Sequence, residues 1–250
     1  MTRILALLSL WLLFVGAAPT LVPDVSSRRV EIQTSFTGEE LLLFGAIIYP
    51  GDMPAGGADV AVVLRGPADS ILVREKQKVA GVWVNADSQL FRSAPGFYAV
   101  ASSAPLDRLV DERTAAIYEL GLANLQLSPG AGQDPAGERR IEQGFIERMQ
   151  EAQLYAEYPD GIEVTDGVLY RARIAIPSRV PVGEYTAETF LIADGRVLAV
   201  ATRDVAIGKT GFERFVALAA ERRQWEYGLA AVAISLFLGW FAAFVFARRS

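Results

Sequence analysis

The sequence of 250 residues contains no cysteine and no histidine. Without cysteine, the chain cannot form a disulfide, present a thiolate nucleophile, or hold an iron–sulfur cluster or a cysteine-type zinc site. Without histidine, it lacks the commonest metal ligand and the commonest general base at neutral pH. These two absences exclude Ser-His-Asp and Cys-His catalysis, and we expect no cofactor. Chemistry based on carboxylate, lysine or tyrosine side chains stays open.

Charge is also sparse. Charged residues make up 21% of the chain, the formal net charge is −5, and no arginine- or lysine-rich run is present. Nucleic-acid binding relies on such runs, so we expect no nucleic-acid partner. Hydrophobic residues make up 52% of the chain, more than in an average soluble domain. We therefore expect part of the chain to lie in a lipid bilayer.

The N-terminus has the pattern of a secretory signal peptide over residues 1–18. Arg3 forms a short basic region, Ile4–Val15 an apolar region, and Gly16–Ala18 the small residues of a cleavage site. Cleavage after Ala17 fits this pattern best, and an uncleaved N-terminal anchor is the alternative. The signal predicts that the middle of the chain is exported.

The C-terminus contains a run of 20 residues without charge, from 228 to 247. A helix of about 20 apolar residues is long enough to cross the hydrocarbon core of a bilayer. Residues that favour the membrane interface flank this run: Trp225, Tyr227, Arg248 and Arg249. We predict a single transmembrane helix over residues 228–247, followed by a cytoplasmic tail, 248–250.

The orientation of this span depends on the signal peptide. Arg222 and Arg223 precede the span and Arg248 and Arg249 follow it, so the charge bias is nearly balanced. Because export places the preceding residues outside, the C-terminus should lie in the cytoplasm. The predicted location is the bacterial inner membrane, with the main domain, residues 19–208, in the periplasm.

Most of the main domain has the two-residue period of β-strands. In the clearest run, residues expected to face water alternate with four apolar residues expected to face the core: Tyr170, Ala172, Ile174 and Ile176. The more continuously apolar runs 40–49 and 59–66 are typical of central strands. Asp194-Gly195 lies between two apolar runs and predicts a hairpin of residues 183–193 and 196–207.

Further strands are expected near residues 71–76, 79–85, 88–93 and 97–103. About ten short strands with frequent turns favour a mainly β fold, an Ig-like β-sandwich, arranged as one sandwich or two. Two helices interrupt the strands at about 105–153. The first helix should begin at Pro105 and carry an apolar stripe: Leu106, Leu109, Val110, Ile117 and Leu120. The second helix should begin at Asp134-Pro135, and its apolar stripe consists of Ile141, Phe145, Met149 and Ala152. An amphipathic stalk helix, 209–227, should lead into the membrane span.

Several blocks of this sequence resemble one known family. They are LLLFGA (41–46), VLRGP (63–67), GVWVN (81–85), GFYAVASSAPL (96–106) and VPVGEYTAETFLIADGRV (180–197). The chain is similar to the alphaproteobacterial family described as "putative transmembrane protein", which has no assigned activity. The resemblance implies an inner-membrane protein with a periplasmic domain and suggests a permease as a partner. No functional residues are established in that family, so none are carried over.

Three short segments are candidates for a partner or ligand surface. Arg65 ends one expected strand, while Trp83 and Asn85 share a face of another; Phe97 and Tyr98 follow a turn. In the alternative, structural interpretation, Trp83 and one ring of the Phe97-Tyr98 pair lie in the core. Asn85 then lies in a turn and Arg65 at a solvated strand end. Sequence alone favours this structural interpretation.

Carboxylates and small residues give weaker signals. The aspartates in the first half of the domain are scattered, and no pair has a spacing that forces a shared site: Asp52, Asp59, Asp69, Asp87, Asp107 and Asp111. No calcium-loop motif occurs, and we expect no metal site. In the predicted span, Ser235, Gly239 and Ala243 lie at intervals of four residues, which allows close helix–helix approach.

The sequence therefore predicts a non-enzymatic accessory or interaction protein. Its partners would be the lipid bilayer and an integral membrane protein such as a permease. The first alternative is a module that binds a small periplasmic solute or an envelope glycan through loops of the sandwich. The second alternative is an anchored hydrolase that uses a pair of carboxylates brought together in space.

Overall fold

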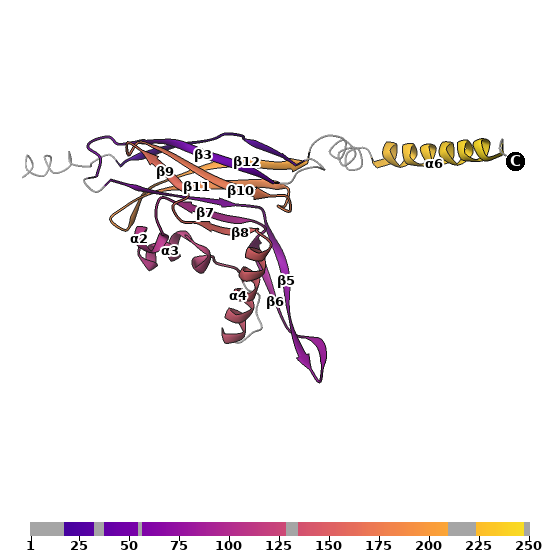
Figure 1. The fold of residues 1–250 in the computed structure, drawn as a ribbon, viewed down its shortest axis with the longest axis horizontal. Coiled ribbons are helices and arrows are strands. Elements are labelled where there is room, and N and C mark those ends of the chain that lie inside the picture. The colour runs from indigo at the N-terminus through magenta and orange to yellow at the C-terminus, as the bar shows by residue number, and fades with distance from the viewer. Residues whose placement is uncertain (1–17, 33–37, 55–56, 129–134, 210–223, 248–250) are drawn as a thin grey trace, which may run out of the picture. The chain divides into compact units, whose positions relative to one another are not determined.

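The structure is a computed structural model that describes residues 18–32, 38–54, 57–128, 135–209 and 224–247 (Figure 1). Most of the predicted signal peptide, most of the predicted stalk, and Arg248 and Arg249 lie outside these residues. The chain divides into two compact units. The first unit comprises residues 1–30 and 36–207, and the second comprises residues 31–35 and 208–250. The fold of the first unit is mainly β.

One sheet of the first unit has four antiparallel strands in the order β1-β3-β10-β9. These strands are β1 (Thr20–Val25), β3 (Gly38–Ile48), β10 (Leu169–Pro177) and β9 (Ile162–Thr165). The alternation predicted for β10 is confirmed, because Tyr170, Ala172, Ile174 and Ile176 are all buried. The run 40–49 is a central strand, as expected, but burial in β3 alternates along the chain. One face of this sheet is therefore covered and the other is open.

A second sheet has six strands in the order β2-β12-β11-β4-β7-β8. The strands are β2 (Arg29–Ile32), β12 (Arg196–Lys209), β11 (Gly183–Ala193), β4 (Asp59–Arg65), β7 (Tyr98–Ser102) and β8 (Tyr155–Tyr158). The predicted hairpin is confirmed in β11 and β12, with Asp194 and Gly195 at φ of 50° and 75° in its turn. Strand β8 pairs with β7 in parallel, a connection that the helices between them make possible.

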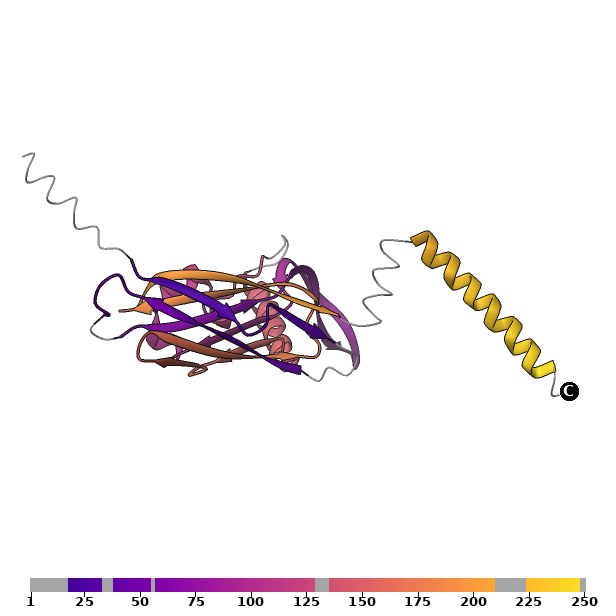
Figure 2. The same ribbon diagram turned by 90° about the horizontal axis from the view of Figure 1, so that it is seen from above.

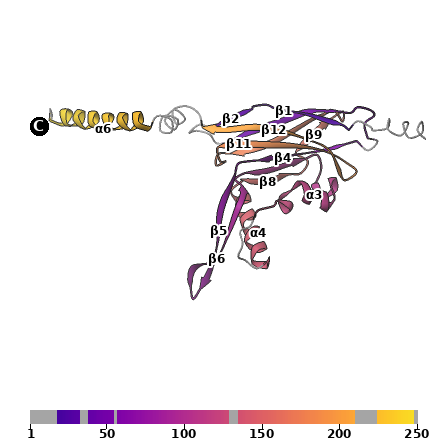
Figure 3. The same ribbon diagram turned by 180° about the vertical axis from the view of Figure 1, so that it is seen from behind.

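Strand β4 is buried on both faces, because layers pack on both sides of the six-stranded sheet. On one side, the hydroxyl of Tyr170 in β10 lies 3.4 Å from that of Thr189 in β11, which links the two sheets. Figure 2 shows the strands of the first unit from above. On the other side, Ala61 and Val63 pack in a hydrophobic cluster with the helices. Figures 1 and 3 show that the helices between β7 and β8 lie on this side of the sheets. The sheets thus form a layered β structure with a core on each side of β4.

Strands β5 (Ala68–Val79) and β6 (Val82–Pro95) form a separate two-stranded hairpin that projects away from the sheets (Figures 1 and 3). We call this hairpin the arm. The strands expected near 71–76 and 88–93 are confirmed within β5 and β6, but the strand expected at 79–85 is wrong because it contains the turn. The turn lies at Ala80-Gly81, with φ of 49° and 88°. Alanine is seldom found in this left-handed conformation, so the turn carries no clear sequence signal.

The region between β7 and β8 contains α2 (Leu106–Leu109), α3 (Glu112–Tyr118), the 3₁₀ turn η1 (Leu122–Asn124) and α4 (Pro135–Glu151). The single helix expected from Pro105 is wrong. Val110 is extended and separates α2 from α3, whose N-cap is Asp111. As a result, Ile117 is exposed instead of joining the apolar stripe. The second helix is confirmed as α4, with Ile141 and Phe145 buried.

The described part of the second unit consists mainly of α6 (Gln224–Ala247), which contains the whole uncharged run 228–247. Its described apolar side chains, among them Leu229, Leu236 and Phe237, are exposed in the single chain. Among the described residues, no helix combines the length and the hydropathy of a membrane span. The transmembrane helix therefore stays a prediction.

Candidate functional site

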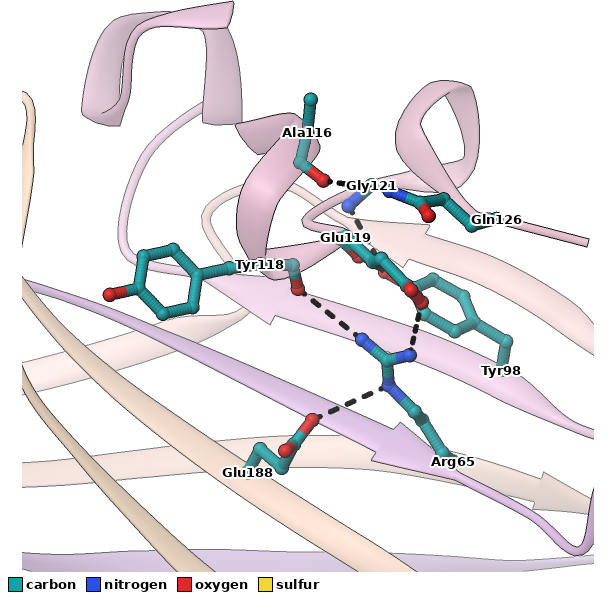
Figure 4. Close-up of polar contacts among 8 residues, drawn as sticks. All are labelled: Arg65, Tyr98, Ala116, Tyr118, Glu119, Gly121, Gln126 and Glu188. Carbon is teal, nitrogen blue, oxygen red and sulfur yellow. Dashed lines mark hydrogen bonds and ion pairs between the residues drawn. The ribbon is translucent and has the colours of Figure 1, made fainter. Parts of the chain in front are cut away.

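Arg65, a predicted site residue, lies at the end of β4 at the centre of a polar cluster (Figure 4). Its Nη1 forms an ion pair with the carboxylate of Glu119, and its Nη2 donates a 3.3 Å hydrogen bond to the carbonyl of Tyr118. Its Nε lies 3.4 Å from Glu188 Oε2, without the geometry of a hydrogen bond. The guanidinium lies 5.7 Å from the ring centroid of Tyr98, close enough for a cation–π contact. We call these residues the Arg65 cluster.

The backbone of the α3–η1 connection positions the carboxylate of this cluster. Glu119 follows α3 in the left-handed conformation, with φ of 51°. The hydroxyl of Tyr98 donates a 2.8 Å hydrogen bond to the carbonyl of Glu119 and accepts a 3.0 Å hydrogen bond from the N–H of Gly121. Burial raises the pKa of Tyr98 well above that of a free phenol. The tyrosine therefore acts as a neutral clamp on the connection.

The Arg65 cluster holds β4, the end of α3 and β11 together through non-covalent contacts. The Arg65 side chain is about one-quarter exposed, and its charge is opposed by Glu119 and Glu188. No group of three metal-ligating side chains was found in the part of the chain that the structure describes. The sequence pointed to Arg65 and Tyr98 but not to Glu119 and Glu188. Their separations from Arg65 along the chain exceed 50 residues, and no local pattern reports such a pairing.

Of the other predicted surface residues, Tyr98 joins this cluster, whereas Trp83, Asn85 and Phe97 do not. Trp83 and Asn85 lie near the tip of the arm, where Trp83 is 65% exposed, so placing its ring in the core is wrong. Phe97 and Tyr98 are both buried, so the prediction that their rings form part of an exposed partner or ligand surface is wrong. The ring of Phe97 packs 5.8 Å from that of Tyr185.

A groove of about 620 Å³ lies on the outer face of the four-stranded sheet. Its floor is apolar, formed by Val22, Leu42, Phe44, Ala46 and Leu169, and Asp24, Glu163 and Arg171 are among its other lining residues. We call it the sheet groove. The register explains it: Ala46 pairs with Val22 on one side and with Leu169 on the other, so these apolar side chains share one face. The sequence indicates a central strand over this apolar run but not the groove.

The predicted helix-packing residues lie on α6. The hydroxyl of Ser235 donates a 2.8 Å hydrogen bond to the carbonyl of Ala231, so it is satisfied within the helix. A Cβ atom added at Gly239 would meet nothing within 4 Å. Trp225 is 92% exposed at the helix start, and Tyr227 and Ala243 also belong to α6.

These observations describe a mainly β protein with a structural ion-pair cluster, an open apolar sheet face and an exposed apolar C-terminal helix. A family model described as "Putative transmembrane protein" matches residues 20–248. The chain belongs to this family, which confirms the resemblance seen in the sequence.

Comparison with curated protein sequences found no match. Among solved structures, the chain is similar to Spo0M, a sporulation control protein from Bacillus subtilis, with 10% sequence identity. The similarity covers 82% of this chain and 56% of Spo0M, and the TM-score is 0.29. This chain thus matches little more than half the length of that structure, and the likeness carries no functional argument.

Proposed function

We propose that this chain is a membrane-anchored accessory protein that displays its β unit on the periplasmic side and binds an integral membrane protein. The carrying observation is α6, which contains 20 consecutive uncharged residues, 228–247. A helix of 20 residues rises about 30 Å, the thickness of a hydrocarbon core. Membership of a family described as transmembrane supports the anchor. The signal-like N-terminus, residues 1–18, supports the periplasmic location.

The partner in this proposal is a membrane protein such as a permease, which would pack on one face of α6. Ser235, Gly239 and Ala243 give that face small side chains, and small residues allow two helix backbones to approach closely. A Cβ added at Gly239 would meet nothing within 4 Å, so this face of the helix has room for a packing partner.

The anchor is tested by alkaline extraction of membranes that contain the full chain or a chain ending at residue 223. The full chain should stay in the membrane pellet, and the truncated chain should be released. Protease added to the periplasmic side should degrade the β unit while a C-terminal tag stays protected. Extraction of the full chain into the supernatant would overturn the anchor.

The partner is tested by tagged purification from native membranes in mild detergent. Gly239→Ile should remove the co-purifying membrane protein, because a branched side chain prevents close packing on that face. Ala233→Ile is the matched control, since it adds a similar volume about 120° around the helix. Equal recovery of the partner with both variants would rule out packing through the Gly239 face.

The sheet groove supports a second candidate, the binding of a small periplasmic solute. Its volume of about 620 Å³ falls within the range of small-molecule sites, and its apolar floor favours an apolar solute over a glycan. A thermal-shift screen of apolar solutes against the full chain would test this candidate. Leu169→Gln should abolish any shift, whereas Leu72→Gln, a similarly exposed leucine on the arm, should retain it.

We propose a non-enzymatic role in preference to an anchored hydrolase. Glu119 and Glu188 are two carboxylates that converge in the described structure, but both face Arg65, and their separation is set by that side chain. A hydrolase would need one carboxyl group held protonated and a second held ionised across a substrate cleft. Hydrolysis of a glycoside by the purified chain, lost in Glu188→Gln, would contradict this proposal.

A further inference from the structure

The tip of the arm carries a cluster of exposed apolar side chains that the fold does not require. Val79, Val82 and Trp83 are 56%, 65% and 65% exposed, and Val84 is also exposed. We propose that this tip binds the surface of a lipid bilayer that contains anionic phospholipids. The inference goes beyond the accessory function and does not use α6, because it rests only on residues of the arm and α4.

One face of the arm is cationic. The register pairs Arg74 with Ser88, Lys76 with Asn85, and Lys78 with Trp83, and directly paired residues of an antiparallel ladder project to the same side. Arg74, Lys76 and Lys78 are exposed, and no ion pair joins them to a carboxylate among the described residues. The chain has three lysines, Lys76, Lys78 and Lys209, so two of them lie near this tip.

Asp69 lies at the base of the arm, and the carboxylates nearer the tip lie on its other face. Glu75 pairs with Asp87 in the ladder, and both bind Arg140 of α4, at 3.0 Å and 3.1 Å. Nearer the base, Val73 and Phe91 continue this face into the hydrophobic cluster. Near the tip, the charges are therefore separated by face: Glu75 and Asp87 are engaged by α4, and Arg74, Lys76 and Lys78 face outward. Such a separation favours an anionic partner on the outer face.

The shape of the arm tip suits insertion into the membrane–water interface. The two-residue turn at Ala80-Gly81 is tight, so the Val79 and Val82 pair forms a blunt apolar end. Trp83 comes next to this end, and Lys78 lies beside it. Tryptophan rings favour the headgroup level of a membrane, and lysines beside them attract anionic headgroups. From the tip of the arm towards its base, the side chains are first apolar and then aromatic and basic. A bilayer has the matching order, with acyl chains inside and charged headgroups outside.

A bilayer fits these features better than a protein partner. The arm tip is a convex end, and a lipid surface needs no complementary pocket. Lysines on exposed strands also discourage edge-to-edge pairing, which is a structural reason for Lys76 and Lys78. That role does not account for Val79, Val82 and Trp83, because exposed apolar residues at a free hairpin end increase the tendency to associate.

The test uses the full chain held in a non-ionic amphipol, which covers α6, and mixed with preformed vesicles. Ala80→Cys provides a unique labelling position, because the natural chain has no cysteine. With phosphatidylcholine and phosphatidylglycerol together, an environment-sensitive fluorophore there should shift to the blue and be quenched by brominated lipids. The same fluorophore at Gln150→Cys, an exposed position on α4, should show neither change.

The charge requirement is tested on the same vesicles. Loss of two cations near an anionic surface should weaken binding of the Lys76→Gln/Lys78→Gln chain by roughly 30-fold. Arg108→Gln/Arg179→Gln removes two charges from exposed positions elsewhere in the β unit and should leave binding nearly unchanged. Trp83→Ser should reduce quenching by brominated lipids without changing the thermal midpoint.

Three results would overturn the inference. The first is a label at Ala80→Cys that stays solvated on phosphatidylglycerol vesicles. The second is equal binding to vesicles with and without the anionic lipid. The third is a Lys76→Gln/Lys78→Gln chain that aggregates faster but binds vesicles as well as the natural chain, which would leave the lysines with an edge-protection role only.

Discussion

The hydroxyl of Tyr98 donates a 2.8 Å hydrogen bond to the carbonyl of Glu119 and so fixes the point where α3 ends. The same hydroxyl accepts a 3.0 Å hydrogen bond from the N–H of Gly121. Two backbone groups on either side of Leu120 therefore depend on one buried side chain. Glu119 is held in the orientation in which its carboxylate meets Arg65. Tyr98 thus joins the strand β7, the helix α3 and the Arg65 cluster.

Tyr98→Phe should lower the free energy of unfolding by about 2–4 kcal/mol, because it leaves a carbonyl and an N–H without a partner in a buried place. Tyr49→Phe is the matched control, since it removes one 3.3 Å hydrogen bond, to Gly167, at a less buried position. It should cost about 1 kcal/mol or less. Urea unfolding of both variants measures the difference. Equal losses would show that the Tyr98 hydroxyl is not a clamp.

Arg65→Met should destabilise the fold by about 1–3 kcal/mol, a range reduced from that of fully buried pairs because the cluster is partly exposed. The change leaves Glu119 and Glu188 without their common cation. In a double-mutant cycle, Arg65→Met in a Glu188→Gln background should cost measurably less than in the natural chain. Additive effects would mean that the 3.4 Å approach of Nε to Glu188 contributes nothing.

Sequence patterns predicted those parts of the fold in which neighbouring residues determine the structure. The alternation in β10 and the Asp194-Gly195 turn are local, and both are confirmed. The break at Val110 could not be seen, because an extended Val110 forms a bridge with Gly195, 85 positions away. The turn at Ala80-Gly81 was missed because alanine occupies a conformation that favours glycine or asparagine.

The candidate sites follow the same rule. Arg65 was selected as a strand end, but its partners come from α3 and β11, which only the fold brings together. The face of the sheet groove requires the register of β1, β3 and β10. The two faces of the arm likewise depend on pairing across Ala80-Gly81, and on an irregularity between Glu75 and Lys76.

Stability should fall in alkaline solution, starting at about pH 10. Burial raises the pKa of Tyr98, Tyr155 and Tyr185 above their value in the unfolded chain, 10.0. A raised pKa means that the unfolded state ionises first, so this stability is complete below pH 10 and is lost as the pH rises further. Tyr155→Phe should flatten the loss above pH 10, measured by urea unfolding at several pH values. An unchanged slope would contradict this.

The N-cap of α3 should give the opposite pH dependence. The side chain and backbone of Thr114 donate hydrogen bonds to Asp111, which lowers the pKa of that carboxyl group from 3.8. A lowered pKa stabilises the fold above pH 3.8, and this contribution is lost as the pH falls through the lower value in the folded chain. Asp111→Ala should therefore destabilise the fold at neutral pH and have a smaller effect in strong acid. A penalty independent of pH would contradict the charged cap.

Gly45 and Gly144 should respond to alanine with opposite signs. A Cβ at Gly45 would lie 2.5 Å from the carbonyl oxygen of Val22 and 2.6 Å from the hydroxyl of Tyr170, so β1 or the ring must move. Overpacking of this kind costs about 1–3 kcal/mol. A Cβ at Gly144, within α4, meets nothing within 4 Å, so Gly144→Ala should stabilise the fold by about 0.5–1 kcal/mol. Thermal unfolding of the two variants tests both signs, and a neutral Gly45→Ala would show that β1 does not pack on β3 in this register.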